Sequence, residues 1–151
     1  MAETLGSLCD KLTVVKLKQW HTSDERRSES LACQAGRLAE EIDVYVTDAL
    51  GGVVDSDRIT FPSNKVFDLG EKSLPEVIGS LGHIVSELAR VNCELWHEQE
   101  KVYEIQRSPE SHSDAVHVVR RLGALNLGRT QCIDAIDESL LKAVVNGAST
   151  S

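Results

Sequence analysis

Two charged residues stand in otherwise apolar helical patterns, and they are the first candidates for chemistry. Glu98 interrupts a seam of Val, Leu and Ile residues over 77–105, and Arg129 interrupts a similar seam over 118–143. A charge on a packed helix face is costly unless it is paired or solvated. We therefore expect each charge to have a polar partner or to line a polar cavity.

The two charges stand at different levels along the expected helices. In an antiparallel hairpin that turns near residue 110, Glu98 lies level with Leu122, and Arg129 lies level with Val91. This places the charges about 10 Å apart along the hairpin, so they need not pair with each other. The alternatives are a pair across a subunit interface, a buried network that sets helix register, or a ligand cavity. The expected lining of such a cavity is Asn92, Trp96, Glu98, Asn126 and Arg129.

Carboxylates on the same two segments suggest a different, metal-dependent site. Glu94 and Glu98 lie one helical turn apart, and Asp134 and Asp137 stand on the facing helix. Carboxylates from two helices form the oxygen-rich ligand set that Mg²⁺ or Mn²⁺ prefers. The alternative function is therefore a divalent-metal-dependent all-α nucleotide pyrophosphohydrolase with Mg²⁺ or Mn²⁺ as its cofactor. No E-x-x-E motif precedes Asp134 at the spacing of such enzymes, so this is an analogy of fold.

A Trp-His dipeptide occurs twice, as Trp20-His21 and as Trp96-His97. Because a buried indole N–H usually finds a partner, both Trp residues are expected to pack between helices. The alternative is stacking on the base or sugar of a ligand, with phosphate contacts supplied by basic residues.

Charge and hydropathy exclude some classes of function. The chain carries 24 acidic and 16 basic residues, a net charge of −8, without a long basic run. General nucleic-acid binding, which depends on neutralising phosphates, is therefore disfavoured, although a local basic pocket is compatible with this charge. The chain shows neither a signal peptide nor an apolar run of membrane-spanning length, so we expect no membrane association and a cytoplasmic location.

The cysteines show no metal-binding spacing. Cys9, Cys33, Cys93 and Cys132 each fall in a different expected helix. We expect buried free thiols in a reducing compartment.

Four helical segments must position these residues. They are expected at about 4–21, about 30–50, from a Ser73 cap to Ser108, and from about 113 to beyond 143. Residues 51–72 break the periodicity and form a long irregular loop, which Phe61 and Phe67 are expected to pin to the bundle. The predicted fold is an all-α bundle of about four helices in two antiparallel hairpins. It forms one domain over 1–151, with a frayed tail from about 145.

The expected helices differ in length. The last two are about 50 Å long and the first two about 30 Å, at the usual rise per residue. A short hairpin cannot cover a long one, so part of the long seam should face another subunit. We therefore expect a homodimer or a larger homo-oligomer.

Three segments resemble a known group of bacterial proteins. They are LCDKLTVVKLKQWH at 8–21, NCELWHEQEKV at 92–102 and RRLGALNLGRTQCIDAID at 120–137. Together they resemble the DUF4254 type of uncharacterised helical proteins and its relatives. The resemblance implies an α-helical fold and carries no established activity.

These observations favour an oligomeric helical binding module. It would hold a small polar or anionic ligand, with a nucleotide as one candidate, in a polar cavity between the long helices. The metal-dependent hydrolase and a scaffold without a ligand remain the alternatives.

Overall fold

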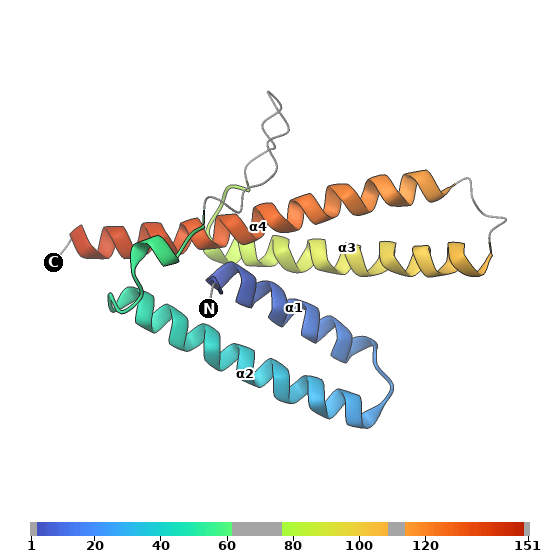
Figure 1. Cartoon of the computed structure of the whole chain (residues 1–151), viewed down its shortest axis with the longest axis horizontal. Coiled ribbons are helices and arrows are strands. Elements are labelled where there is room, and N and C mark those ends of the chain that lie inside the picture. Colours follow the sequence, from blue (N-terminus) through green and yellow to red (C-terminus); the bar gives the residue numbers. More distant parts are fainter. Residues whose placement is uncertain (1–2, 62–76, 109–113, 150–151) are drawn as a thin grey trace.

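The protein is an all-α bundle, as predicted (Figure 1). The computed structural model describes residues 3–61, 77–108 and 114–149, and within them it contains helices and no strand. The helices are α1 (Leu5–His21), α2 (Glu25–Leu50), the 3₁₀ turn η1 (Ser56–Arg58), α3 (Leu81–Arg107) and α4 (Ala115–Ser149).

The first hairpin begins with a reciprocal cap. The Thr4 hydroxyl accepts from the Ser7 backbone N–H at 3.2 Å, and the Ser7 hydroxyl accepts from the Thr4 N–H at 3.1 Å. Helix α2 starts at Glu25, five residues before the predicted start. The Asp24 carboxylate caps it by accepting from the Arg27 N–H at 2.8 Å. A cap within a polar, exposed stretch allows a helix to begin without any apolar periodicity, so the hydrophobic pattern missed this first turn.

The described part of the predicted loop, residues 51–61, is irregular apart from η1. Ile59 is fully buried, and the Tyr45 hydroxyl donates to the Arg58 carbonyl at 3.4 Å. These contacts hold the segment against α2. Phe61 is half-buried, and Phe67 lies outside the described residues.

Helix α3 begins at Leu81, so the predicted start near Ser73 is wrong. The cap is Ser80, whose hydroxyl accepts from the His83 N–H at 3.3 Å. The preceding Gly79 has a φ of +153°, a value that residues with side chains rarely adopt and that does not belong to a helix. Ser73 itself lies outside the described residues. At the other end of the chain, α4 continues to Ser149, through most of the segment expected to be a frayed tail.

The two hairpins meet where α1 packs across α3 and α4. The central cluster includes Leu5, Ala49, Ile59, Ile84, Leu88, Cys132, Ile136 and Leu140, and a second cluster between α1 and α2 contains Leu8, Val15, Leu31, Ala35 and Leu38. The ends of α3 and α4 that face residues 109–113 extend beyond α1 and α2 (Figure 1). The expected difference in length is wrong for α2 and α3, which have 26 and 27 residues, and it holds only between α1, with 17 residues, and α4, with 35.

All four cysteines are free thiols, as predicted. Their predicted burial is correct for Cys132 and wrong for Cys33 and Cys93, which are exposed on α2 and α3. Within the described ranges, no helix combines the length and the hydropathy needed to cross a membrane.

Candidate functional site

Arg129 binds a buried carboxylate that connects three helices. Its Nε and Nη2 donate to the two Asp10 carboxylate oxygens at 2.8 and 2.5 Å. Asn92 Nδ2 donates to the same carboxylate at 3.0 Å and to the Thr13 hydroxyl at 2.7 Å. Asp10 is only 5 % exposed, so its charge is compensated by these donors from α3 and α4. The hydrogen bonds that Arg129 donates to Asp10 raise the pKa of its guanidinium above the usual value, against the effect of burial.

Sequence reasoning missed Asp10, although α1 carries a signal for it. Gly6, Asp10 and Thr13 follow at helical spacing and form a second face of α1, beside the apolar stripe that packs on α2. A search for hydrophobic periodicity does not detect a buried helix face that is made of small and polar residues. Their spacing indicates a face on which another helix approaches closely.

Glu98 is buried at a different place along α3. It is 8 % exposed, and its Oε1 accepts from Lys101 Nζ at 2.8 Å, one turn further along the same helix. Its other oxygen, Oε2, is buried without a hydrogen-bond partner in the described part of the chain. Glu98 and Arg129 therefore have separate partners, in agreement with the offset expected along the hairpin.

The other two residues of the predicted ligand cavity lie elsewhere. Trp96 stacks on His21 with ring centroids 4.5 Å apart, and its indole N–H donates to Glu100 at 3.0 Å. Asn126 is exposed on α4. The structure thus brings Asn92 and Arg129 together around one carboxylate, whereas Trp96, Glu98 and Asn126 lie outside that cluster. The expected packing of Trp20 between helices is wrong, because this side chain is 86 % exposed.

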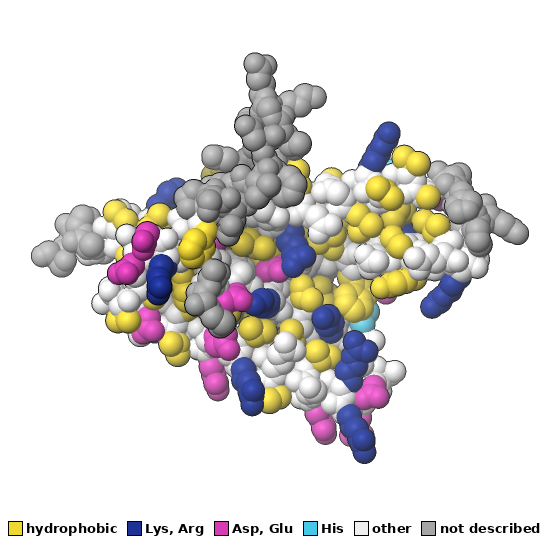
Figure 2. Space-filling model, in the orientation of Figure 1, with side chains coloured by type: hydrophobic (Ala, Val, Ile, Leu, Met, Phe, Trp, Pro, Cys, Tyr) yellow, Lys and Arg dark blue, Asp and Glu magenta, His cyan; other side chains and the backbone are white. Residues whose placement is uncertain are grey.

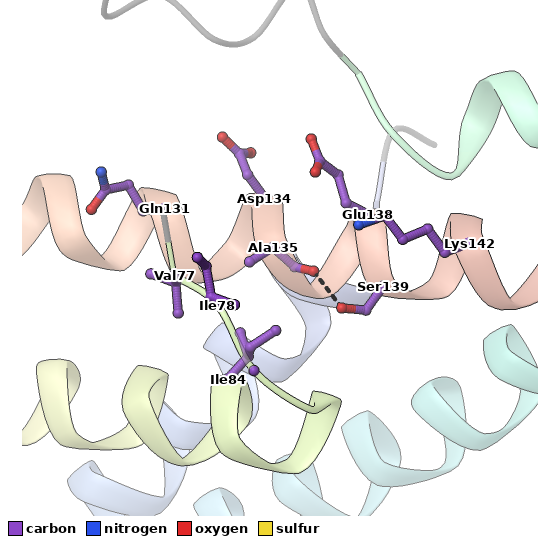
Figure 3. Close-up of a pocket in the computed structure, with 10 residues that line it drawn as sticks. Val77, Ile78, Ile84, Gln131, Asp134, Ala135, Glu138, Ser139 and Lys142 are labelled. Carbon is purple, nitrogen blue, oxygen red and sulfur yellow. Dashed lines mark hydrogen bonds between the residues drawn. The ribbon is translucent and has the colours of Figure 1, made fainter. Parts of the chain in front are cut away.

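The four carboxylates of the predicted metal site have different surroundings. Glu94 pairs with Arg90 at 2.5 Å and with Arg121 at 2.6 Å. Asp134 lines a hollow of about 370 Å³ between α4 and the segment before α3 (Figure 3). Among the residues that the structure describes, no group of three or more His, Cys, Asp or Glu side chains is placed to hold a metal ion.

Asp137, the fourth of these carboxylates, faces the start of α1. It is 6 % exposed and accepts from the Gly6 N–H at 2.7 Å and from the Thr4 side chain. Burial raises the pKa of Asp137 to about 6, against the lowering effect of these two hydrogen bonds. This carboxylate therefore titrates close to neutral pH.

Arg129 also lines an open groove between α1 and α2, with a volume of about 470 Å³. Figure 2 shows Lys and Arg side chains gathered over this part of the molecule. Lys11 lines the groove and is paired with Glu3. Lys18 and Arg37 line it too, and neither forms an ion pair with another described residue. We name this site the basic groove. Its basic side chains are Lys11, Lys18, Arg37 and Arg129, and its carboxylates are Glu3, Asp10 and Glu41.

In comparisons with known proteins, no family model, curated protein or solved structure matched this chain. The resemblance to the DUF4254 type therefore stays a prediction.

Proposed function

We propose that the protein is a non-enzymatic helical binding module that holds a small anionic ligand in the basic groove. The observation that carries the proposal is the position of Arg129 in this groove, where it is fixed by Asp10 and lies among further basic side chains. The proposed ligand position differs from the predicted one, because it lies between α1, α2 and Arg129 of α4.

The charges in the groove support an anion as the ligand. Asp10 compensates Arg129, and Glu3 compensates Lys11. The remaining charged residues described in the groove are two cations, Lys18 and Arg37, and one carboxylate, Glu41. The described lining of the groove therefore has one more cation than it has anions. A phosphate group could accept from several of these donors at once, as charge-assisted hydrogen bonds require.

Preorganisation also supports binding. The Arg129 side chain is 38 % exposed. Its guanidinium is already held in one orientation by two hydrogen bonds to Asp10. A ligand therefore need not order this side chain, which lowers the entropic cost of binding.

The expected homo-oligomer is part of this proposal. Its support is the uncovered end of the α3–α4 hairpin, where Tyr103 is 53 % exposed, Val116 61 % and Val119 67 %. Apolar side chains grouped at such an end are typical of helix bundles completed by another subunit.

Isothermal titration with inorganic phosphate, pyrophosphate and a nucleoside triphosphate, each with and without EDTA, tests the ligand class. We expect binding that persists in EDTA. Lys18→Gln and Arg37→Gln should each weaken it about tenfold, the loss of one charge-assisted hydrogen bond. Arg120→Gln is the matched control, because Arg120 is exposed on α4 and does not line the groove. Metal-dependent binding with release of pyrophosphate would contradict the proposal and support the hydrolase instead.

A further inference from the structure

A second hollow continues from the basic groove along α2 and has a different character. Its volume is about 710 Å³, and it shares Glu3, Leu8, Arg37 and Glu41 with the basic groove. Its remaining lining residues are Glu40, Val44, Tyr45, Asp48 and Val54. We name it the acidic hollow.

The acidic hollow has an apolar floor. Leu8 is buried, Tyr45 and Val54 are half-buried, and Val44 is 59 % exposed. An exposed Val beside buried apolar neighbours offers a surface that a hydrophobic side chain could cover. The α2 residues that line the hollow, from Arg37 to Asp48, span three helical turns, so the hollow runs along the helix axis with Val44 and Tyr45 as its apolar α2 residues.

Carboxylates surround this floor. Glu40, Glu41 and Asp48 line the hollow, and none of the three forms an ion pair with another described residue. Figure 2 shows acidic side chains over the C-terminal half of α2, interleaved with hydrophobic ones. Arg37 is the one basic residue among the described residues that line the hollow. The local potential is therefore negative and favours a cationic partner.

We propose that the acidic hollow binds an amphipathic helix of a partner protein, with Leu-like side chains on one face and Lys or Arg residues along its edges. The length and direction of the hollow suit a helix laid beside α2, and Glu40 and Asp48, which lie outside the basic groove, suit its basic residues. This surface is separate in its chemistry from the anion site, and it does not require the proposed function to be correct.

The probe is a fluorescent synthetic helix with a Leu face and Lys residues elsewhere, and binding is measured by anisotropy. Two comparison peptides carry Glu in place of Lys, or Gln in place of Leu. We expect the Leu and Lys peptide to bind at least about tenfold more tightly than either, with an affinity that falls as salt is added.

Substitutions locate the binding site. Val44→Gln should weaken the Leu and Lys peptide about tenfold, and Glu40→Gln combined with Glu41→Gln should remove most of the salt dependence. Ile78→Gln is the matched control, since Ile78 is 79 % exposed and lines the hollow of Figure 3 instead. Circular dichroism checks that each variant is folded, which is expected because Val44 and Glu40 are exposed.

Two results would overturn the proposal. One is equal binding of the Lys and Glu peptides. The other is a wild-type oligomer that Val44→Gln dissociates, because the hollow would then be covered by a second copy of the chain. Lys18→Gln separates this proposal from the anion site, because it should weaken phosphate binding and leave peptide binding unchanged.

Discussion

At the scale of single residues, the main feature is a pair of buried carboxylates with opposite surroundings. Asp10 faces the guanidinium of Arg129 and the amide of Asn92, so its charge is compensated. Among the residues that the structure describes, Asp137 accepts from the Gly6 N–H and the Thr4 side chain and faces no cation, and Asp134 and Glu138 raise its pKa further. The first carboxylate forms an ion pair, and the second has a raised pKa and retains a proton at higher pH than a solvated Asp would.

The raised pKa of Asp137 predicts a dependence of stability on pH. Its folded-state pKa is about 6 and the ordinary value is 3.8, so the folded protein holds this proton more tightly than the unfolded chain does. This contribution to stability is full below about pH 4 and is lost as the pH rises through 6. Asp137→Asn, which cannot ionise, should therefore be more stable than the wild type at pH 7.5, by up to about 3 kcal/mol, and similar to it at pH 4. Urea denaturation at both values measures the difference, and an Asn variant destabilised equally at both would contradict this origin of the shift.

The Asp10–Arg129 pair predicts a strong energetic coupling. Arg129→Met leaves a buried carboxylate without its main partner and should destabilise the fold by about 3–5 kcal/mol. Asp10→Asn removes that charge, so the double variant should be more stable than the sum of the two single losses predicts. Denaturant unfolding of the wild type, the two single variants and the double variant gives the coupling energy of the pair. If the two single losses of stability add up to the loss in the double variant, Asp10 and Arg129 are not energetically coupled.

At the scale of elements, the contact between α1 and α4 depends on a glycine. A Cβ atom built on Gly6 would lie 2.3 Å from the Ile133 carbonyl oxygen, which is backbone and cannot easily move. The close approach brings the start of α1 to Asp137, whose carboxylate accepts from the Gly6 N–H. One position therefore controls both the helix crossing and the surroundings of the buried acid.

Two glycine-to-alanine substitutions distinguish the effect of helix packing on stability from the effect of helix propensity. Gly6→Ala should destabilise the protein by about 2 kcal/mol or more, because the helices must move apart. Gly36→Ala is the matched control on α2, where a Cβ meets nothing within 4 Å, and it should stabilise by about 0.5–1 kcal/mol. Thermal unfolding of both variants gives the comparison. Similar stabilisation by both would show that α1 and α4 are not in close contact at Gly6.

The helices were more predictable from sequence than their ends and crossings. The apolar stripes identified all four helices, because burying one face requires that periodicity. Helix ends depend on caps, and Ser73 and Ser80 carry the same hydroxyl, so the sequence pattern could not identify Ser80 as the cap of α3. The partner of Arg129 was not predictable, because no local pattern specifies the level at which α1 crosses the long hairpin.

At the scale of the whole molecule, the two hairpins divide the proposed functions between them. The α1–α2 hairpin carries the basic groove and the acidic hollow, while the α3–α4 hairpin supplies Arg129 and projects an uncovered end (Figure 1). Anion binding and partner binding would then occupy adjoining sites that share Arg37 and Glu41, while self-association would use the other end of the molecule.

The uncovered end predicts self-association. Sedimentation equilibrium should give a mass of at least twice 16.6 kDa, because the exposed apolar side chains there are stabilised by a second subunit. Tyr103→Glu, a change at an exposed side chain of that end, should shift the protein towards the monomer, whereas Ile78→Gln should not. A monomer at every accessible concentration would refute the oligomer.

The proposal that an anion binds beside Arg129 can be tested with a crystal soaked in tungstate. The anomalous signal of tungsten should lie in the basic groove, within hydrogen-bonding distance of Lys18 or Arg37, and should disappear in the Lys18→Gln/Arg37→Gln variant. An empty groove in the wild-type crystal, with tungsten bound only elsewhere on the molecule, would contradict it.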